Sequence, residues 1–232
     1  MKVLAVETST MAGSVALVDG EELVSEYLLN ISITHSERIL VAIDHVTRDA
    51  KVPIKEVDGF AVSLGPGSFT GLRIGISTIK GLAFATKKPV VGIPTLDALA
   101  ENILFTDYLI CPILDARKKE VYTALYKRDK IDKLKKLTPV LAIKPIDLLK
   151  KIQEKVVFLG DGIDVYHTLI KEGLGDLAIF APLNLRLPRA GNIAKRSLDQ
   201  FKKTNLMNLN TFTPSYVRRS EAEEKFRERT GN

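Results

Sequence analysis

The order of predicted elements repeats along the 232-residue chain, and this repeat constrains the fold more than any other feature. Hydrophobic periodicity predicts three strands, a helix, a strand and a helix between residues 3 and 86. The same order returns from residue 109, after a further strand at 90–93 and a helix at 95–104. Because each unit is far longer than a solenoid repeat of roughly 20–50 residues, the pattern predicts two similar α/β lobes.

Signals at the ends of the elements support the first half of this assignment. A turn at Gly13 joins the first two strands, and Asp19-Gly20 precedes the third. Residues 34–37 (Thr-His-Ser-Glu) match a capping box, in which the Thr hydroxyl and the Glu carboxylate each accept a hydrogen bond from the other residue's amide. The predicted strands are 3–8, 14–18, 22–28 and 59–64, and the predicted helices are 34–50 and 68–86.

The second half repeats this order and places two pairs of positions in correspondence. Glu7, near the end of the first strand, corresponds to Asp115, and the turn at 65–67 corresponds to the turn at 160–162. We therefore expect one lobe over residues 1–105 and a second over 106–232, the second ending in a helical tail. The predicted strands of this half are 109–115, 121–126, a weaker one near Val140 and 156–159, and the predicted helices are 145–154 and 165–171.

Composition predicts a globular protein of the cytoplasm. The hydrophobic fraction is 45% and the charged fraction 27%, both ordinary values for a folded domain. No apolar run approaches the ~20 residues that span a bilayer, and the first residues lack the pattern of a signal peptide. Cys111 is the single cysteine, so no internal disulfide is expected, and its apolar surroundings predict a buried, unreactive thiol.

The net charge of +6 permits a nucleic-acid partner without requiring one. Many of the basic residues lie between positions 195 and 229, where glutamates at 221–228 are interleaved with the last of them. A solvated helix held by salt bridges is the favoured interpretation of this tail, and direct contact with a nucleic acid is the weaker alternative.

The most distinctive segment is 65–75, which we call the hallmark segment. It is not a P-loop, because Arg73 has no Lys-Ser/Thr pair beside it, and it lacks the spacing of the dinucleotide fingerprint. Gly65 and Gly67 permit backbone angles that other residues avoid, while Ser68 or Thr70 is suited to cap the next helix and leave amides that can bind an anion. Its characteristic positions are Gly65, Pro66, Gly67, Ser68, Thr70, Gly71, Arg73 and Gly75.

The helix that follows this segment combines apolar residues with three glycines, Gly71, Gly75 and Gly81. Each glycine weakens an isolated helix by up to ~1 kcal/mol relative to Ala, which makes sense where another backbone approaches closely. One interpretation is a helix buried within its own lobe. The other is a helix shared between the lobe and a partner subunit, and the pattern leaves both open.

Two lobes that each open on a hairpin with an acid at its turn resemble the duplicated, ribonuclease H-like fold of actin, sugar kinases and Hsp70. In that fold the two hairpin turns bind the phosphates of ATP. More specifically, the hallmark segment resembles that of the bacterial TsaB family, also called YeaZ. The further matches run in order along the chain and are Glu7-Thr8-Ser9, Thr34-His35-Ser36-Glu37, Asp115-Ala116-Arg117, Glu120-Val121-Tyr122 and Pro214-Ser215-Tyr216-Val217-Arg218.

The resemblance implies a non-catalytic scaffold subunit in the synthesis of threonylcarbamoyladenosine, the modified base beside the anticodon of some tRNAs. In that family the protein pairs with its catalytic relative TsaD, which transfers the threonylcarbamoyl group to tRNA, and the ATPase TsaE joins them. Apolar faces of the helices at 35–50 and 70–86 are suited to docking on TsaD, or to homodimer formation by the chain alone. The partner-binding residues predicted on these faces are Ile39, Ile43, Val46, Leu72, Ile76, Ile79 and Ala83.

Catalytic metal ligands are missing from the sequence. The resemblance implies a His-x-x-x-His pair in the catalytic relative, and the two matching positions here hold Thr95 and Leu99. The three histidines, His35, His45 and His167, are too far apart to replace it, and surface or capping roles are the favoured interpretation. We expect neither a bound metal nor the metalloprotease activity that such ligands would support.

The nucleotide-binding turns are also incomplete. Thr8 and Ser9, beside Glu7, can donate to a phosphate, whereas the second turn, after Asp115, lacks the glycine that lets amides approach an anion. No cofactor is required, and weak nucleotide binding at Glu7, Thr8, Ser9 and Asp115 stays an open alternative. The alternative function is a small-molecule kinase or ATPase of the same fold.

Overall fold

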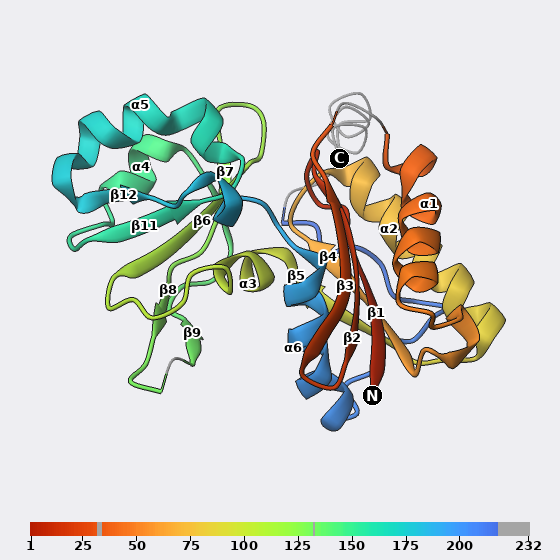
Figure 1. Ribbon diagram of the computed structural model, residues 1–232. Helices are drawn as coiled ribbons and strands as arrows, with labels where there is room; N and C mark the ends of the chain where they lie inside the picture. The colour runs from red at the N-terminus through yellow and green to blue at the C-terminus, as the bar shows by residue number, and fades with distance from the viewer. Residues whose placement is uncertain (32–33, 132, 218–232) are drawn as a thin grey trace.

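The protein is built from two sheets in two lobes, as the sequence predicts (Figure 1). The structure, a computed structural model, describes residues 1–31, 34–131 and 133–217. The strands of the first sheet are β1 (Lys2–Glu7), β2 (Gly13–Asp19), β3 (Glu22–Leu29), β4 (Gly59–Gly65) and β5 (Val90–Pro94). Those of the second sheet are β6 (Leu109–Asp115), β7 (Val121–Thr123), β8 (Tyr126–Arg128), β9 (Leu134–Lys136), β10 (Leu141–Ile143), β11 (Val156–Leu159) and β12 (Ala178–Phe180).

The two sheets have the same strand order, which confirms the predicted duplication. The first runs β3-β2-β1-β4-β5 and the second β10-β7-β6-β11-β12, with the β8–β9 hairpin attached to β6. In both, the first three strands in this order are antiparallel and the last three parallel. This is the two-lobed fold of actin, sugar kinases and Hsp70.

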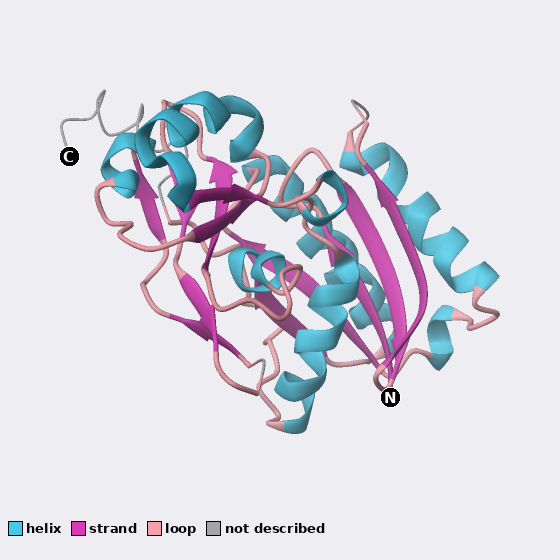
Figure 2. Ribbon diagram, turned by 60° about the vertical axis from the view of Figure 1, so that its left-hand side comes forward, coloured by secondary structure: helices cyan, strands magenta, loops and turns pink. Residues whose placement is uncertain are grey.

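Helices cover both faces of the first sheet (Figure 2). The helices are α1 (His35–Asp49), α2 (Phe69–Thr86), α3 (Thr95–Ala100), α4 (Pro145–Leu149), α5 (Gly162–Leu174) and α6 (Ala190–Lys202). One face packs against α1 and α2 through a core that includes Phe60 and Ile79, and α6 packs on the other face through Ile193 and Ala194. In the second lobe, α4 and α5 pack on one face of the sheet and α3 contributes to the other. Because successive side chains along a strand point to opposite faces, each sheet buries apolar side chains on both of its faces.

The C-terminal part of the chain corrects the predicted lobe boundary. Helix α6 follows β12 in sequence but buries Ala190, Ile193 and Phe201 against the first sheet. After it, Phe212 joins the core under α1 and α2. The second lobe thus ends before α6, because the apolar face of this helix complements the first sheet. The predicted helical tail after residue 217 lies outside the described residues.

Several element boundaries also differ from those predicted. The strand predicted over 121–126 is divided into β7 and β8, and β9 and β12 were missed because three-residue strands carry little pattern. Helix α4 is shorter than predicted and α5 is longer. The capping box is wrong in detail, because the Thr34 hydroxyl donates to the Glu37 carboxylate (2.9 Å) and caps no amide.

Candidate functional site

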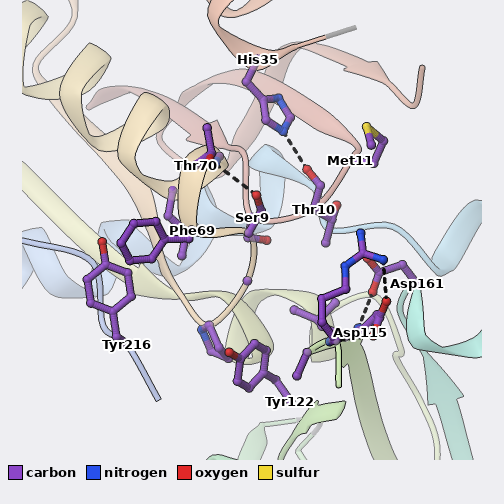
Figure 3. A pocket seen from close by; sticks show the side chains of 18 of the residues that line it. Ser9, Thr10, Met11, His35, Phe69, Thr70, Asp115, Tyr122, Asp161 and Tyr216 are labelled. Atoms are coloured by element: carbon purple, nitrogen blue, oxygen red, sulfur yellow. Dashed lines mark hydrogen bonds and ion pairs between the residues drawn. The ribbon is translucent and has the colours of Figure 1, made fainter. Parts of the chain in front are cut away.

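A pocket of about 560 Å³ lies between the two lobes and brings together the motifs singled out in the sequence (Figure 3). The first lobe contributes the turn after β1 and the hallmark segment at the start of α2. The second lobe contributes the turn after β6, together with Tyr122 and Asp161. Residues 215–217 complete the wall. The pocket therefore lies at the carboxyl ends of the parallel strands, where ligands bind in open α/β sheets.

The hallmark segment packs directly on the turn after β1, and its glycines make this possible. A Cβ atom at Gly67, Gly71 or Gly75 would come closer than 3.0 Å to an oxygen of Thr8 or Ser9. The Ser68 amide donates to the Ser9 carbonyl (2.6 Å), and the Ser68 hydroxyl accepts from the Gly71 amide. The close backbone approach expected from the glycines is confirmed at Gly71, and Gly67 shows the same contact, whereas the near neighbour of Gly75 is the Thr8 side chain. All of these contacts lie within the same chain.

The segment 206–217 returns to the hallmark segment from the C-terminal side. The Ser215 amide donates to the Leu64 carbonyl (2.8 Å), and a Cβ at Gly65 would lie 2.8 Å from the Ser215 carbonyl oxygen. Tyr216 stacks on Phe69 with ring centroids 4.8 Å apart, and the Arg73 guanidinium lies 3.7 Å above Phe69. The Arg73 Nε also donates to the Tyr216 hydroxyl (3.0 Å). This stack forms one side of the pocket (Figure 3).

A buried His–Arg pair holds the turn after β1 from the other side. His35 Nε2 lies 2.7 Å from the Thr10 carbonyl oxygen, so this nitrogen donates. Arg38 donates to the Met11 carbonyl (2.5 Å) and lies 3.2 Å from His35 Nδ1. Burial lowers the pKa of His35, which keeps the ring neutral. The sequence interpretation of His35 as a surface or capping residue is therefore wrong.

The turn after β1 does not fit a phosphate group. Glu7 is fully buried, which raises its pKa, and its Oε1 accepts from the Ser9 amide (2.5 Å). A carboxylate thus takes an amide that an incoming anion would need. Thr8 and Ser9 are also buried, their hydroxyls lack a partner among the described residues, and the hallmark segment covers the turn. The geometry disagrees with nucleotide binding through Glu7, Thr8 and Ser9.

The turn after β6 is held by contacts of two acids, Asp115 and Asp161, whose carboxylates accept hydrogen bonds from amides that an anion would need. Asp115 forms an ion pair with Arg117 (3.2 Å), and the Asp115 amide donates to Asp161 (3.1 Å). Residues Arg117, Lys118 and Lys119 all have positive φ angles, a conformation that costs energy without glycine. Burial raises the pKa of Asp161 to about 6. Asp161 lies in the wall of the pocket opposite the Phe69–Tyr216 stack (Figure 3).

The raised pKa of Asp161 gives a stability prediction. In the folded protein Asp161 keeps its proton up to a pH of about 6, whereas in the unfolded chain it loses the proton near its ordinary pKa of 3.8. The free energy of unfolding is therefore highest below this pH range and falls as the pH rises through it. We expect Asp161→Asn to raise the free energy of unfolding at pH 8 by about 1 to 2 kcal/mol, less than the full shift implies because the side chain is partly exposed. Urea unfolding at pH 4 to 8 measures this effect.

Glu172→Gln is the matched control, because Glu172 is an exposed acid near the other end of α5, the helix that begins after Asp161. Its effect should stay within about 0.5 kcal/mol. An effect of Asp161→Asn with the opposite sign, or one equally large at pH 4 and pH 8, would contradict the assignment.

The positions aligned with the missing metal ligands lie in the core. Thr95 and Leu99 are both buried, and Leu99 packs among the residues between α3 and the second sheet. Across the described ranges, no group of three or more His, Cys, Asp or Glu side chains is arranged to hold a metal ion. Cys111 is buried as predicted, and burial raises its pKa to about 12, so the thiol is unreactive.

The predicted partner-binding residues are not at the surface. All seven are buried, with exposed fractions of at most 6%. Six of them lie in the core between the first sheet and helices α1 and α2, and the seventh, Leu72, lies beside Gly65. The outward faces of these helices instead carry Leu40, Val41 and Phe84, whose exposed fractions are 59%, 53% and 79%. The residues predicted to bind a partner therefore form the inward, core-facing sides of these two helices. The buried residues that require this correction are Ile39, Ile43, Val46, Leu72, Ile76, Ile79 and Ala83.

Fold and site together define a protein with the fold of actin and sugar kinases in which the hallmark segment covers the turn after β1. A family model described as TsaD, tRNA N6-adenosine threonylcarbamoyltransferase, matches residues 29–226. The Bacillus subtilis tRNA threonylcarbamoyladenosine biosynthesis protein TsaB is 31% identical over 97% of this chain and 98% of its own length, and the Escherichia coli protein of that name is 28% identical over the same shares. The structure of YeaZ from Pseudomonas aeruginosa superposes with a TM-score of 0.76 at 25% identity, covering 93% of this chain and 99% of that one. The chain belongs to the TsaB (YeaZ) family.

Proposed function

We propose that the chain is a non-catalytic subunit that pairs with TsaD to support threonylcarbamoyl transfer to tRNA. One observation carries this proposal: the fold is intact, yet Thr95 and Leu99 are buried where the catalytic relative is expected to hold its metal. A chain that matches the TsaD family model over residues 29–226 without those ligands is suited to bind its relative rather than repeat its chemistry.

The docking surface in this proposal is the outward face of α1 and α2. Leu40, Val41 and Phe84 expose large apolar side chains there, which is typical of an interaction site. Gly81 lies on the exposed side of α2, and a Cβ at this position would meet no atom within 4 Å. A second helix can therefore approach α2 closely near Gly81. Gly71 and Gly75 therefore fit a helix buried within its own lobe, whereas Gly81 fits a helix shared with a partner subunit.

The partner in this proposal is TsaD, because the family model described as TsaD matches this chain over residues 29–226. Related folds present equivalent helices, so two such faces can pack about an approximate two-fold axis. The same symmetry permits homodimers of this chain when TsaD is absent. In the assembled complex we further propose TsaE as the ATPase component, tRNA as the shared substrate and the cytoplasm as the location.

The alternative of a small-molecule kinase or ATPase is not favoured. Such an enzyme needs its hairpin turns to hold nucleotide phosphates, whereas Gly67 and Gly71 bring the hallmark segment onto the first turn. At the second turn, Asp115 and Asp161 add acids where a phosphate would need donors.

No helix of the described residues is long and apolar enough to cross a bilayer.

Omission from a reconstituted reaction tests the function. Threonylcarbamoyl transfer to tRNA is measured with TsaD, TsaE and the threonylcarbamoyl adenylate, with and without this chain. We expect the transfer rate to fall at least about tenfold without the chain, equal to a loss of about 1.4 kcal/mol of transition-state stabilisation. An unchanged transfer rate without the chain would contradict the proposed function.

A further inference from the structure

The net positive charge of the protein is concentrated in one stretch of the second lobe. Residues 117–155 contain thirteen lysines and arginines but only five acids, a surplus of eight, while the whole chain has a net charge of +6. The remainder of the chain is therefore slightly acidic. This stretch includes β8 and β9, which form a hairpin that extends from the second lobe (Figure 1).

The hairpin directs three of its lysines to one face. Lys127 on β8 lies directly opposite Lys135 on β9, and side chains two residues apart along a strand share a face, which adds Lys133 to this set. Like charges directly opposite each other destabilise a strand pair. Lys136 and Tyr126 point to the opposite face, where both contact Asp97. We call Lys127, Lys133 and Lys135 the hairpin lysines.

Two acids among the described residues, Asp129 and Glu154, already pair with lysines of the hairpin. Asp129 accepts from the amides of Ile131 and Lys133 (3.1 and 3.0 Å), which orders the turn, and pairs with Lys135 (3.3 Å). Glu154 pairs with Lys127 (2.8 Å). Both pairs are exposed and worth little in water, so an external anion can compete for these lysines at small cost.

The type of basic side chain indicates what the surface recognises. The outward residues are lysines, which act as point charges towards phosphates, whereas Arg128, able to form paired hydrogen bonds, is buried against Glu101 and the Ile103 carbonyl. Such lysines favour contacts with a nucleic-acid backbone, which position a substrate without reading its sequence.

We propose that the hairpin lysines form a contact surface for the phosphate backbone of RNA. This inference rests on the proposed function, in which tRNA is the substrate of the complex and therefore the RNA that this surface would bind. The surface lies on the second lobe, away from the docking face on α1 and α2 of the first lobe (Figure 1). RNA and the partner subunit can therefore bind at the same time.

The test measures binding of fluorescently labelled unmodified tRNA to the full chain by anisotropy across a series of salt concentrations. The variant Lys133→Glu/Lys135→Glu should weaken binding about tenfold at 0.1 M salt and reduce the slope of log affinity against log salt by about two. The matched control Lys55→Glu/Lys195→Glu changes two exposed lysines of the first lobe by the same charge and should change the affinity less than about twofold. A second variant, Lys133→Ala/Lys135→Ala, should show about half of the charge-reversal effect, and circular dichroism confirms that each variant is folded.

Equal affinities for the hairpin variant and the control would overturn the inference, as would wild-type chain that does not bind tRNA. Vesicles containing anionic lipid are a parallel probe, because Ile131 is 83% exposed at the hairpin tip. Binding of vesicles but not tRNA would contradict the assignment of RNA. Since the assay uses this chain alone, its outcome is independent of pairing with TsaD, and the hairpin variant should still pair normally.

Discussion

Leu40→Asp combined with Phe84→Asp is expected to weaken pairing with TsaD at least about 100-fold, which corresponds to about 2.7 kcal/mol. Both side chains are exposed in the chain alone, so the substitutions should leave its fold intact. In the pair they would place two carboxylates in a dry apolar contact without partners, which is among the costliest changes at an interface. Titration calorimetry with purified TsaD measures the loss.

A control for this experiment exists in the second lobe. Val165 and Leu183 are 58% and 78% exposed, close to the values for Leu40 and Phe84, but they lie away from α1 and α2. Val165→Asp/Leu183→Asp should leave the affinity within about twofold. Equal losses from the two double variants, or normal pairing of Leu40→Asp/Phe84→Asp, would exclude the proposed docking face.

The second large effect concerns two glycines of the same helix, for which we expect opposite signs. Gly71→Ala should lower the free energy of unfolding by about 3 kcal/mol, because its Cβ would overlap the Thr8 carbonyl oxygen and neither backbone can move independently. Gly81→Ala should raise it by about 0.5 to 1 kcal/mol, because the added methyl meets no atom and Ala favours the helix.

Urea unfolding at one fixed protein concentration gives both values, since self-pairing would otherwise couple stability to concentration. The same substitution in one helix controls for helix propensity. A similar change in stability for the two variants would show that the hallmark segment does not depend on close contact with the turn after β1.

Hydrophobic periodicity located helices α1 and α2 but could not separate their inward and outward faces. Ile39, Ile43 and Val46 recur at helical spacing because they fill the core of their own lobe. The residues of the proposed docking face are exceptions to this spacing, since Leu40 and Val41 fall on the side of α1 where charged residues are expected. A search for apolar residues outside the main stripe would have identified them.

Contacts that depend on the folded backbone could not be predicted from the sequence. The acid at Glu7 was recognised, but its hydrogen bond to the Ser9 amide depends on the conformation of the turn. Likewise, His35 could be assigned to a helix start, yet its burial against Thr10 depends on how α1 packs against β2 and β3. The return of α6 to the first sheet was missed for a similar reason, because an apolar helix face does not specify which sheet covers it.

The proposed role requires that this chain acts on TsaD by pairing, without chemistry of its own. The most direct measurement is the rate of threonylcarbamoyl transfer by TsaD as increasing amounts of wild-type chain or of Leu40→Asp/Phe84→Asp are added. We expect the wild type to raise the rate to a plateau at one chain per TsaD, while the variant requires at least about 100-fold more protein to reach the same plateau. Full stimulation by the variant at the wild-type concentration, or transfer by this chain without TsaD, would contradict the claim.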